Sequence, residues 1–164
     1  LIFKNGVSVL FGPSGIGKTV LMKNIIKELN KKSDTAFLLT RDLIHDDLVI
    51  SFLCEQLLSN IEAEPKNEPF EELKGIMKRK IEGGRLSTGE IERILIYFGS
   101  TLNQRVLIFD EYFLNVPDND KIKFVKLLIQ RRSNKITLII THDKVMKELE
   151  FINQINLSPR IIDE

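Results

Sequence analysis

Short apolar runs alternate along this chain with longer segments in which apolar residues recur every three or four positions. The runs are typical of buried strands, and they lie at residues 1–3, 7–11, 35–39, 106–110, 136–140 and 151–157. The segments with the helical period predict helices at residues 18–31, 48–61, 70–81, 88–102, 119–132 and 143–150. Strands that alternate with helices indicate an α/β fold, with a mostly parallel sheet flanked by helices.

The helical segments also predict which side chains are buried. The first three helices would bury Leu21, Met22, Ile25, Ile26, Leu29, Ile50, Leu53, Cys54, Leu57, Ile61, Phe70, Leu73, Met77 and Ile81. Cys54 is therefore expected to be a small core residue rather than a nucleophile. The polar residues 40–47 and 65–69 are expected to form loops. The basic cluster at residues 78–80 indicates a solvated helix face, with a docking surface for an acidic partner as the alternative.

The composition is that of a globular protein. The chain has 164 residues, which is long enough for one domain with its own core. Of these residues, 43% are hydrophobic and 29% are charged. The 24 basic and 23 acidic residues leave a net charge of +1, so there is no electrostatic case for nucleic acid as an obligate partner. A single cysteine excludes an internal disulfide and fits a reducing compartment. No apolar run approaches the roughly 18 residues that span a bilayer.

Residues 12–19 fit the pattern G-x-x-x-x-G-K-[ST], between a predicted strand and a predicted helix. The glycines let backbone N–H groups turn inward around a polyphosphate, and the helix N-terminus adds unpaired donors and partial positive charge. Lys18 would reach the outer phosphates, and the Thr19 hydroxyl would be a ligand of Mg²⁺. The nucleotide-binding residues of this P-loop are expected to be Gly12, Pro13, Ser14, Gly15, Ile16, Gly17, Lys18, Thr19 and Val20.

Two acidic residues follow the apolar run at 106–109. Asp110 stands at the expected C-terminal end of that strand, where α/β sheets bind ligands, and is a candidate to hold the hydrated metal with Thr19. Glu111 comes next, and a carboxylate one step beyond the metal-binding acid can polarise an attacking water in line with the γ-phosphate. The alternative is that the two acids open a loop.

Only one of the two histidines is a candidate catalytic residue. His142 follows the strand predicted at 136–140, which puts it at the same edge of the sheet as Asp110. A neutral imidazole there could hydrogen-bond the γ-phosphate or the attacking water, so Glu111, His142 and Lys18 are the candidate catalytic residues. The alternative for His142 is a surface histidine at the end of a strand. His45 is assigned no role.

Residues 86–90 read Leu-Ser-Thr-Gly-Glu and precede an apolar helical segment. Ser87 and Glu90 form S-x-x-E, which is a capping box and needs no function. The longer stretch at residues 86–93 nevertheless resembles the signature of ABC-type ATPases, usually Leu-Ser-Gly-Gly-Gln followed three residues on by an arginine, which Arg93 matches. Asp110 follows Ser87 by 23 residues and precedes His142 by 32, which is similar to the spacing in that family.

The resemblance implies that residues 1–164 form a single P-loop ATPase domain, with a helical subdomain at about residues 46–88. In the family, two domains pair head to tail, and the signature of one caps the ATP on the P-loop of the other. Carried over, Ser87, the Gly89 amide and the helix N-terminus at Thr88 would meet the partner's γ-phosphate. The expected binding segment consists of Ser87, Thr88, Gly89 and Glu90. A helix N-terminus with a free hydroxyl is an anion site, in agreement with that arrangement.

The function implied by the resemblance is hydrolysis of ATP to ADP and phosphate, with Mg²⁺ held by Thr19 and Asp110. The chain would act as an ATP-dependent homo- or heterodimer that energises a small transporter together with a transmembrane subunit. We expect it to be cytoplasmic, and in a transporter it would be peripheral at the cytoplasmic face of the membrane. The alternative is a soluble, non-transport ATP switch that binds a protein or nucleic-acid partner, and a different P-loop class such as a kinase is a third possibility.

The chain also departs from the family pattern. Thr88 stands where a glycine is common. Arg41 occupies the place of a glutamine that usually serves Mg²⁺ and water; a cation cannot ligand Mg²⁺ but can bind phosphate. Only 23 residues separate Lys18 from Arg41, which indicates that the small antiparallel β-subdomain is largely missing. The loop after Glu111 differs from the family's, and no upstream aromatic residue is placed to stack on adenine.

Overall fold

A computed structural model of the protein describes residues 4–31, 36–67 and 69–157 and contains one parallel sheet of five strands. The strands are β1 (Gly6–Phe11), β2 (Ala36–Leu39), β3 (Val106–Asp110), β4 (Ile136–Ile140) and β5 (Asn153–Asn156). Their order across the sheet is β2-β3-β4-β1-β5, and every pairing is parallel. The predicted α/β fold with a parallel sheet is confirmed. The strand expected at residues 1–3 lies outside the described residues.

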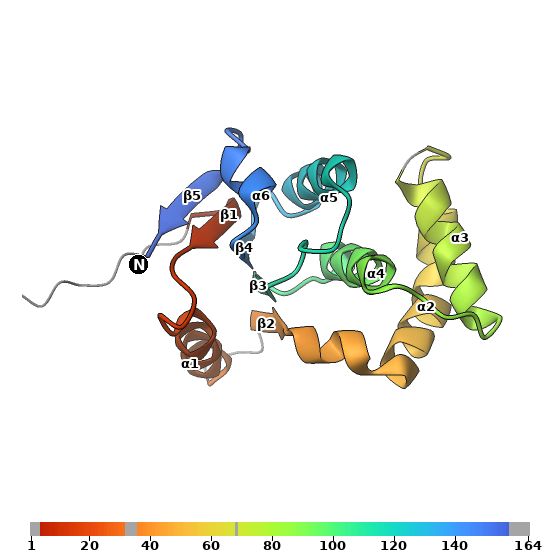
Figure 1. Ribbon diagram of the computed structural model, residues 1–164, viewed down its shortest axis with the longest axis horizontal. Coiled ribbons are helices and arrows are strands. Elements are labelled where there is room, and N and C mark those ends of the chain that lie inside the picture. Colours follow the sequence, from red (N-terminus) through yellow and green to blue (C-terminus); the bar gives the residue numbers. More distant parts are fainter. Residues whose placement is uncertain (1–3, 32–35, 68, 158–164) are drawn as a thin grey trace, which may run out of the picture.

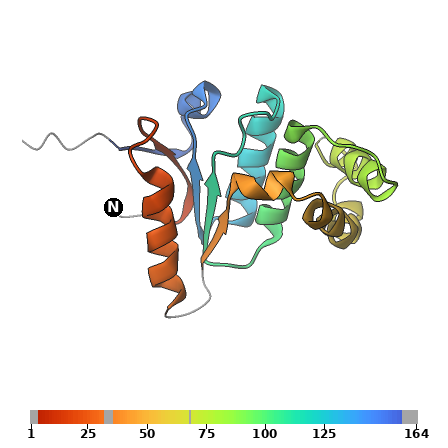
Figure 2. The same cartoon turned by 60° about the horizontal axis from the view of Figure 1, so that its bottom comes forward.

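Helices cover both faces of the sheet. They are α1 (Lys18–Asn30), the 3₁₀ helix η1 (Arg41–His45), α2 (Asp47–Glu62), α3 (Phe70–Ile81), α4 (Thr88–Thr101), α5 (Asp118–Arg131) and α6 (Lys144–Glu148). Figure 2 shows α1 alone on one face and α4 with α5 on the other. The helices α2 and α3 pack on each other and on α4, away from β1 and β5 (Figure 1). The division into a core and a helical subdomain stays a prediction.

The sheet separates two hydrophobic clusters. In β1, Val7, Val9 and Phe11 face the larger cluster under α4 and α5, whereas Leu10 faces the smaller one under α1. This alternation follows from the period of two along a strand. The strands bury both faces, which is why they read as continuous apolar runs in the sequence.

The sheet register brings three strand ends to one edge. Ile140 of β4 lies opposite both Leu10 of β1 and Asp110 of β3. The P-loop, Asp110 and the residues after β4 are therefore neighbours although they are far apart in the sequence. In the described part of the chain, none of the helices is both long enough and apolar enough to cross a membrane.

Some local predictions were wrong. Residues 41–45, expected to be loop, form η1, and Asp46 then caps α2 by accepting a hydrogen bond from the Val49 amide at 3.0 Å. Ile81, expected to be buried, is 39% exposed because it is the last residue of α3. Of the five apolar residues expected on the buried side of α1, Met22 is fully buried and Ile25, Ile26 and Leu29 pack against the smaller cluster, whereas Leu21 is 36% exposed.

The basic cluster at residues 78–80 is only partly a solvated face. Lys80 is 8% exposed, and its Nζ donates to Asp47 Oδ1 at 2.5 Å, which ties α3 to α2. Lys78 and Arg79 are exposed and pair with Glu62 and Glu90. Cys54, by contrast, is fully buried as predicted.

Candidate functional site

The P-loop joins the end of β1 to the start of α1. Gly15 has φ of 81° and Gly17, the N-cap of α1, has φ of 85°, which is the left-handed region that glycine adopts without steric cost. Among the described residues, no side chain caps this helix end. Its first amides are therefore left for an anion, as expected for a phosphate-binding loop.

Lys18 is folded back on its own loop. Its Nζ donates to the carbonyl oxygens of Gly12 and Pro13, each at 2.9 Å, and the residue is 8% exposed. These carbonyl groups are neutral, so a phosphate oxygen would be a stronger acceptor for the ammonium. The lysine is held at the centre of the loop where an incoming phosphate would meet it.

Thr19 and Asp110, the two residues that the sequence assigned to Mg²⁺, lie in contact. The Thr19 hydroxyl donates to Asp110 Oδ1 at 3.2 Å, although the two residues lie 91 positions apart in the chain. Asp110 is 7% exposed at the end of β3. A hydroxyl and a carboxylate are hard oxygen ligands of the kind that Mg²⁺ prefers, and Mg²⁺ usually takes only one or two protein ligands beside phosphates and water. The residues present therefore fit the metal.

Glu111 and His142 face each other beside this pair. His142 Nδ1 lies 3.0 Å from Glu111 Oε2, yet Oε2 is buried and makes no well-oriented hydrogen bond within the described part of the chain. Glu111 also has φ of 60°, which is strained for a residue with a Cβ, while its amide donates to the Ile140 carbonyl at 2.9 Å. Strain of this kind concentrates at functional sites because neighbouring contacts enforce it.

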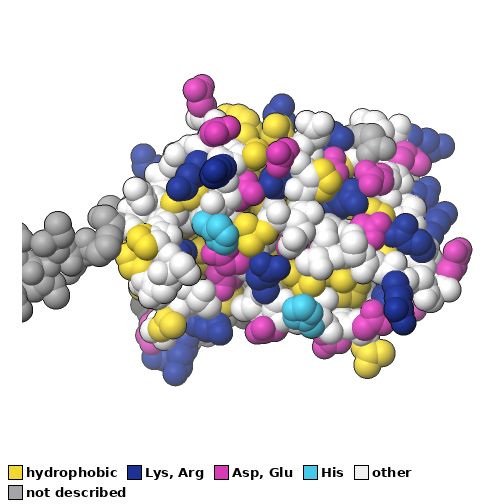
Figure 3. Space-filling view, viewed as in Figure 1, with side chains coloured by type: hydrophobic (Ala, Val, Ile, Leu, Met, Phe, Trp, Pro, Cys, Tyr) yellow, Lys and Arg dark blue, Asp and Glu magenta, His cyan; other side chains and the backbone are white. Residues whose placement is uncertain are grey.

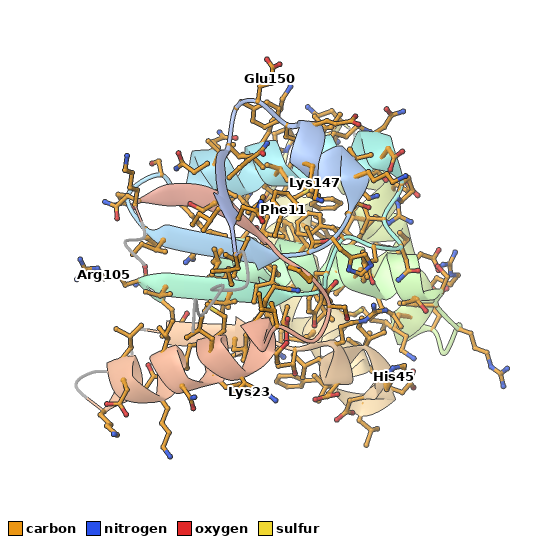
Figure 4. All side chains as sticks on the ribbon, turned by 60° about the vertical axis from the view of Figure 1, so that its left-hand side comes forward. Phe11, Lys23, His45, Arg105, Lys147 and Glu150 are labelled. Atoms are coloured by element: carbon orange, nitrogen blue, oxygen red, sulfur yellow. The ribbon has the colours of Figure 1, made fainter. Side chains whose placement is uncertain are left out.

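A cavity of about 560 Å³ lies beside the P-loop, and Thr19 and Asp110 are not among its lining residues. Its lining includes the start of the P-loop, Lys18, Glu111 and His142, and Arg41 reaches it from η1. Both histidines lie on the face drawn in Figure 3, where acidic and basic side chains are interspersed. The second histidine, His45, is exposed at the end of η1 (Figure 4). It is not among the residues that line the cavity.

The signature-like residues lie elsewhere. Ser87 and Glu90 form the predicted capping box: Ser87 Oγ accepts from the Glu90 amide at 3.3 Å, and Glu90 Oε2 accepts from the Ser87 amide at 2.8 Å. Burial raises the pKa of Glu90, but the hydrogen bonds from Ser87 and the pairing with Arg79 outweigh it and lower the pKa. Neither Ser87, Thr88, Gly89 nor Glu90 lines the cavity, and their contact with a partner's nucleotide stays a prediction.

A buried acid that the sequence did not single out connects α4, which carries the signature-like residues, to the loop that begins with Glu111. Glu92 of α4 is fully buried and accepts hydrogen bonds from Asn115, from the backbone amide at 2.9 Å and from Nδ2 at 2.7 Å. Asn115 belongs to the loop that begins with Glu111. The phenol of Tyr112 in the same loop donates to the Thr40 carbonyl at 2.7 Å. Nothing in the helical period marks Glu92 as buried, because its neighbours Ile91 and Ile94 already define the apolar face.

Comparison with known families gives one match over most of the chain. Residues 3–145 match the model of a family described as AAA domain. The zinc import ATP-binding protein ZnuC of Mannheimia succiniciproducens is 26% identical over 160 residues, covering 87% of this chain and 58% of the relative. ZnuC of Haemophilus influenzae is 26% identical over 171 residues, covering 93% and 63%. The chain thus spans about three fifths of the length of these curated relatives.

A solved structure with the same fold is the dimer of an ATP-binding cassette in a post-hydrolysis state, bound to ADP and phosphate. It has a TM-score of 0.51 and 20% identity, and the match covers 87% of this chain and 78% of that one. It shows the fold, and the ATP-binding relatives confirm the resemblance to ABC-type ATPases that the order and spacing of the motifs indicated.

Proposed function

Since the chain belongs to the AAA domain family, we propose that it is an ABC-type ATPase that dimerises around MgATP and energises a small transporter. The observation that carries the proposal is the contact of Thr19 with Asp110, 3.2 Å apart at the mouth of the P-loop. It pairs a hydroxyl and a carboxylate beside a phosphate-binding loop, which is the arrangement that MgATP requires. The similarity to zinc import ATP-binding proteins favours the ABC type over another P-loop class.

Phosphate binding would use the loop itself. The amides at the start of α1 would donate to the phosphate oxygens, and Lys18 would exchange the carbonyl groups of Gly12 and Pro13 for the outer phosphates. This exchange favours the bound state because a charge-assisted hydrogen bond is stronger than one to a neutral carbonyl group. Val20 follows in the first turn of α1 and is assigned to the same binding site.

Hydrolysis would depend on Glu111 and His142. Thr19 and Asp110 would hold Mg²⁺, which when bound neutralises charge on the phosphate oxygens. Glu111 would accept a hydrogen bond from the attacking water, and its buried Oε2 has the free acceptor capacity for it. His142, 69% exposed and 3.0 Å from that oxygen, would contact the γ-phosphate. Glu111 and His142 would thus align the attacking water with the γ-phosphate before the reaction begins.

Dimerisation would complete the site. Ser87 and Thr88 are exposed at the N-terminus of α4 and outside the cavity of their own chain, so they are available to a second copy or a related chain. With the Gly89 amide they would meet the partner's γ-phosphate, while Glu90 beside them caps the helix, and ATP would hold the two domains together. Hydrolysis would loosen this contact and drive a transmembrane subunit, with the chain peripheral at the cytoplasmic face of the membrane.

Arg41 favours a second candidate, a soluble ATP switch that binds a protein or nucleic-acid partner with little hydrolysis. The guanidinium lines the cavity where a ligand for Mg²⁺ or water would otherwise stand, and it has no lone pair to offer a metal. The two candidates differ in their partner. Copurification with a transmembrane protein from solubilised membranes supports the motor, whereas a purely soluble client supports the switch.

Steady-state ATP turnover tests the proposal. We expect the unmodified protein to release phosphate from MgATP and the Glu111→Gln protein to bind ATP without turnover. Lys18→Ala should lose ATP binding, whereas Lys23→Ala, which removes an exposed lysine further along α1 (Figure 4), should leave it unchanged. Unimpaired turnover by Glu111→Gln would refute the assignment of the catalytic carboxylate.

A further inference from the structure

Arg41 lies between two hydrogen-bond acceptors: the carboxylate of Glu92 and the phosphate that a ligand would bring into the cavity. It is the first residue of η1, and its Nη2 lies 3.8 Å from Oε1 of the buried Glu92. The same side chain is 41% exposed and lines the cavity with Lys18 and the start of the P-loop. The guanidinium is therefore within reach of both a buried carboxylate and the space that phosphate would occupy.

The contact with Glu92 is weak. A separation of 3.8 Å is too long for a hydrogen bond, and Glu92 already accepts two hydrogen bonds from Asn115, at 2.9 and 2.7 Å. Glu92 consequently keeps its hydrogen bonds if Arg41 leaves. Glu92 is fully buried, but the guanidinium is 41% exposed to solvent that screens the pair, so at this separation the contact contributes about fivefold at most to any equilibrium.

The backbone beside Arg41 is held in place. The carbonyl of Thr40 accepts a hydrogen bond from the Tyr112 hydroxyl at 2.7 Å, and Tyr112 itself is fully buried. This bond fixes the start of η1 to the loop that carries Glu111. A change in the position of the guanidinium is therefore a rotation of the side chain, which costs far less than a movement of the helix.

We propose that Arg41 distinguishes ATP from ADP by binding the γ-phosphate. Its side chain would turn from Glu92 to the γ-phosphate when ATP is bound and stay beside Glu92 when ADP is bound. The proposal rests on the proposed function, because it requires ATP in the P-loop. Arginine binds phosphate with two parallel hydrogen bonds, whereas lysine acts as a point charge. Such a contact in a partly enclosed site contributes about tenfold or more to affinity, which exceeds what the Glu92 contact opposes.

Equilibrium titration with ADP and with a non-hydrolysable ATP analogue, by calorimetry, separates this role from a general electrostatic one. Arg41→Ala should weaken binding of the ATP analogue by about tenfold or more and change ADP binding by less than about twofold. Arg41→Lys should lie between, because the charge remains and the paired hydrogen bonds are lost. Arg105→Ala is the matched control, an exposed arginine at the far end of the sheet (Figure 4).

Glu92→Gln tests the resting position of Arg41. Removing the carboxylate charge should leave ADP binding unchanged and tighten binding of the ATP analogue by up to about fivefold. Weaker binding of the analogue by this variant, with ADP binding unchanged, would show that Glu92 positions Arg41 for phosphate instead of competing with it, and would overturn the resting role. The ADP measurement also registers any disturbance of the loop, because glutamine keeps only one of the two acceptors for Asn115.

The outcomes distinguish the inference from the proposed function. Failure of the unmodified protein to bind either nucleotide would overturn both. If the unmodified protein binds both nucleotides and Arg41→Ala weakens them equally, or weakens neither, only the inference is overturned. The thermal unfolding midpoint of each variant is measured alongside, and Arg41→Lys supplies the decisive comparison if Arg41→Ala unfolds.

Discussion

Gly89 lies directly against the backbone of Asn115, so that a Cβ added at Gly89 would stand 2.2 Å from the Asn115 carbonyl oxygen. The contact joins the first turn of α4 to the loop that begins with Glu111. Asn115 is also held to α4 by Glu92. The glycine in the signature-like segment thus has a structural reason within a single chain, in addition to the proposed contact with a partner's phosphate.

We expect Gly89→Ala to destabilise the protein by about 1–3 kcal/mol, because the rigid backbone oxygen cannot give way. Gly75→Ala is the matched control, since Gly75 is an exposed residue inside α3 and no atom of the described residues lies within 4 Å of the added Cβ. Alanine there should stabilise by about 0.5–1 kcal/mol. Thermal unfolding should separate the two variants, at about 2–4 °C for each kcal/mol. Equal midpoints would contradict the close approach at Asn115.

Arg93, the residue that matches the arginine of the family signature, connects three helices. Its Nη1 donates to Glu72 of α3 at 2.7 Å and to Asp120 of α5 at 3.1 Å, and the residue is 8% exposed. Arg93→Ala should lower the free energy of unfolding by about 3 kcal/mol, because it leaves a nearly buried carboxylate without this partner. Urea denaturation measures the effect, with the exposed Arg85→Ala as control; similar midpoints for the two variants would refute it.

Cys54 should make the free energy of unfolding depend on pH in the alkaline range. Burial raises the pKa of its thiol from 9.0 to about 11. Below pH 9 the thiol is protonated in both states; above it, the unfolded state releases the proton first, so stability is lost as pH rises through the folded pKa. At about pH 10.5 the loss should be about 2 kcal/mol relative to pH 8.

The Cys54→Ala protein isolates this contribution. Alanine lowers stability by a constant amount, whereas the difference from the unmodified protein should shrink between pH 8 and pH 10.5 in urea denaturation. Tyr97, whose pKa burial raises to about 12, titrates in both proteins and cancels in the comparison. A difference that does not change with pH would contradict the assignment to Cys54.

The sequence predicted the features that depend on local pattern. The strands at 106–110 and 136–140 match β3 and β4 residue for residue, because a strand buried on both faces is a continuous apolar run. Thr19 and Asp110, which the sequence assigned to one Mg²⁺, lie close together in the structure, since parallel strands place their C-terminal ends at one edge. Their role as ligands stays a prediction. The capping box of Ser87 and Glu90 followed from spacing alone.

Other features depend on tertiary contacts and could not be predicted from the pattern of apolar and polar residues. Arg132 is fully buried and donates to Thr137 Oγ1 and to the carbonyl oxygens of Leu102 and Gln104, at 2.7–2.9 Å. Burial lowers the pKa of this guanidinium to about 10. Lys80 and Glu92 are likewise charged residues buried by distant partners. Periodicity assigns such residues to the surface, because it registers hydrophobicity and not the partner that satisfies a charge.

Gel filtration of the Glu111→Gln protein with and without MgATP tests the central claim most directly. The protein should elute as a monomer without nucleotide and as a dimer with MgATP, because ATP that is bound and not hydrolysed would hold the Ser87 end of α4 against the partner's P-loop. Addition of Lys18→Ala should abolish the dimer, because that variant does not bind the nucleotide. Elution as a monomer under conditions where bound ATP is measured directly would contradict the claim.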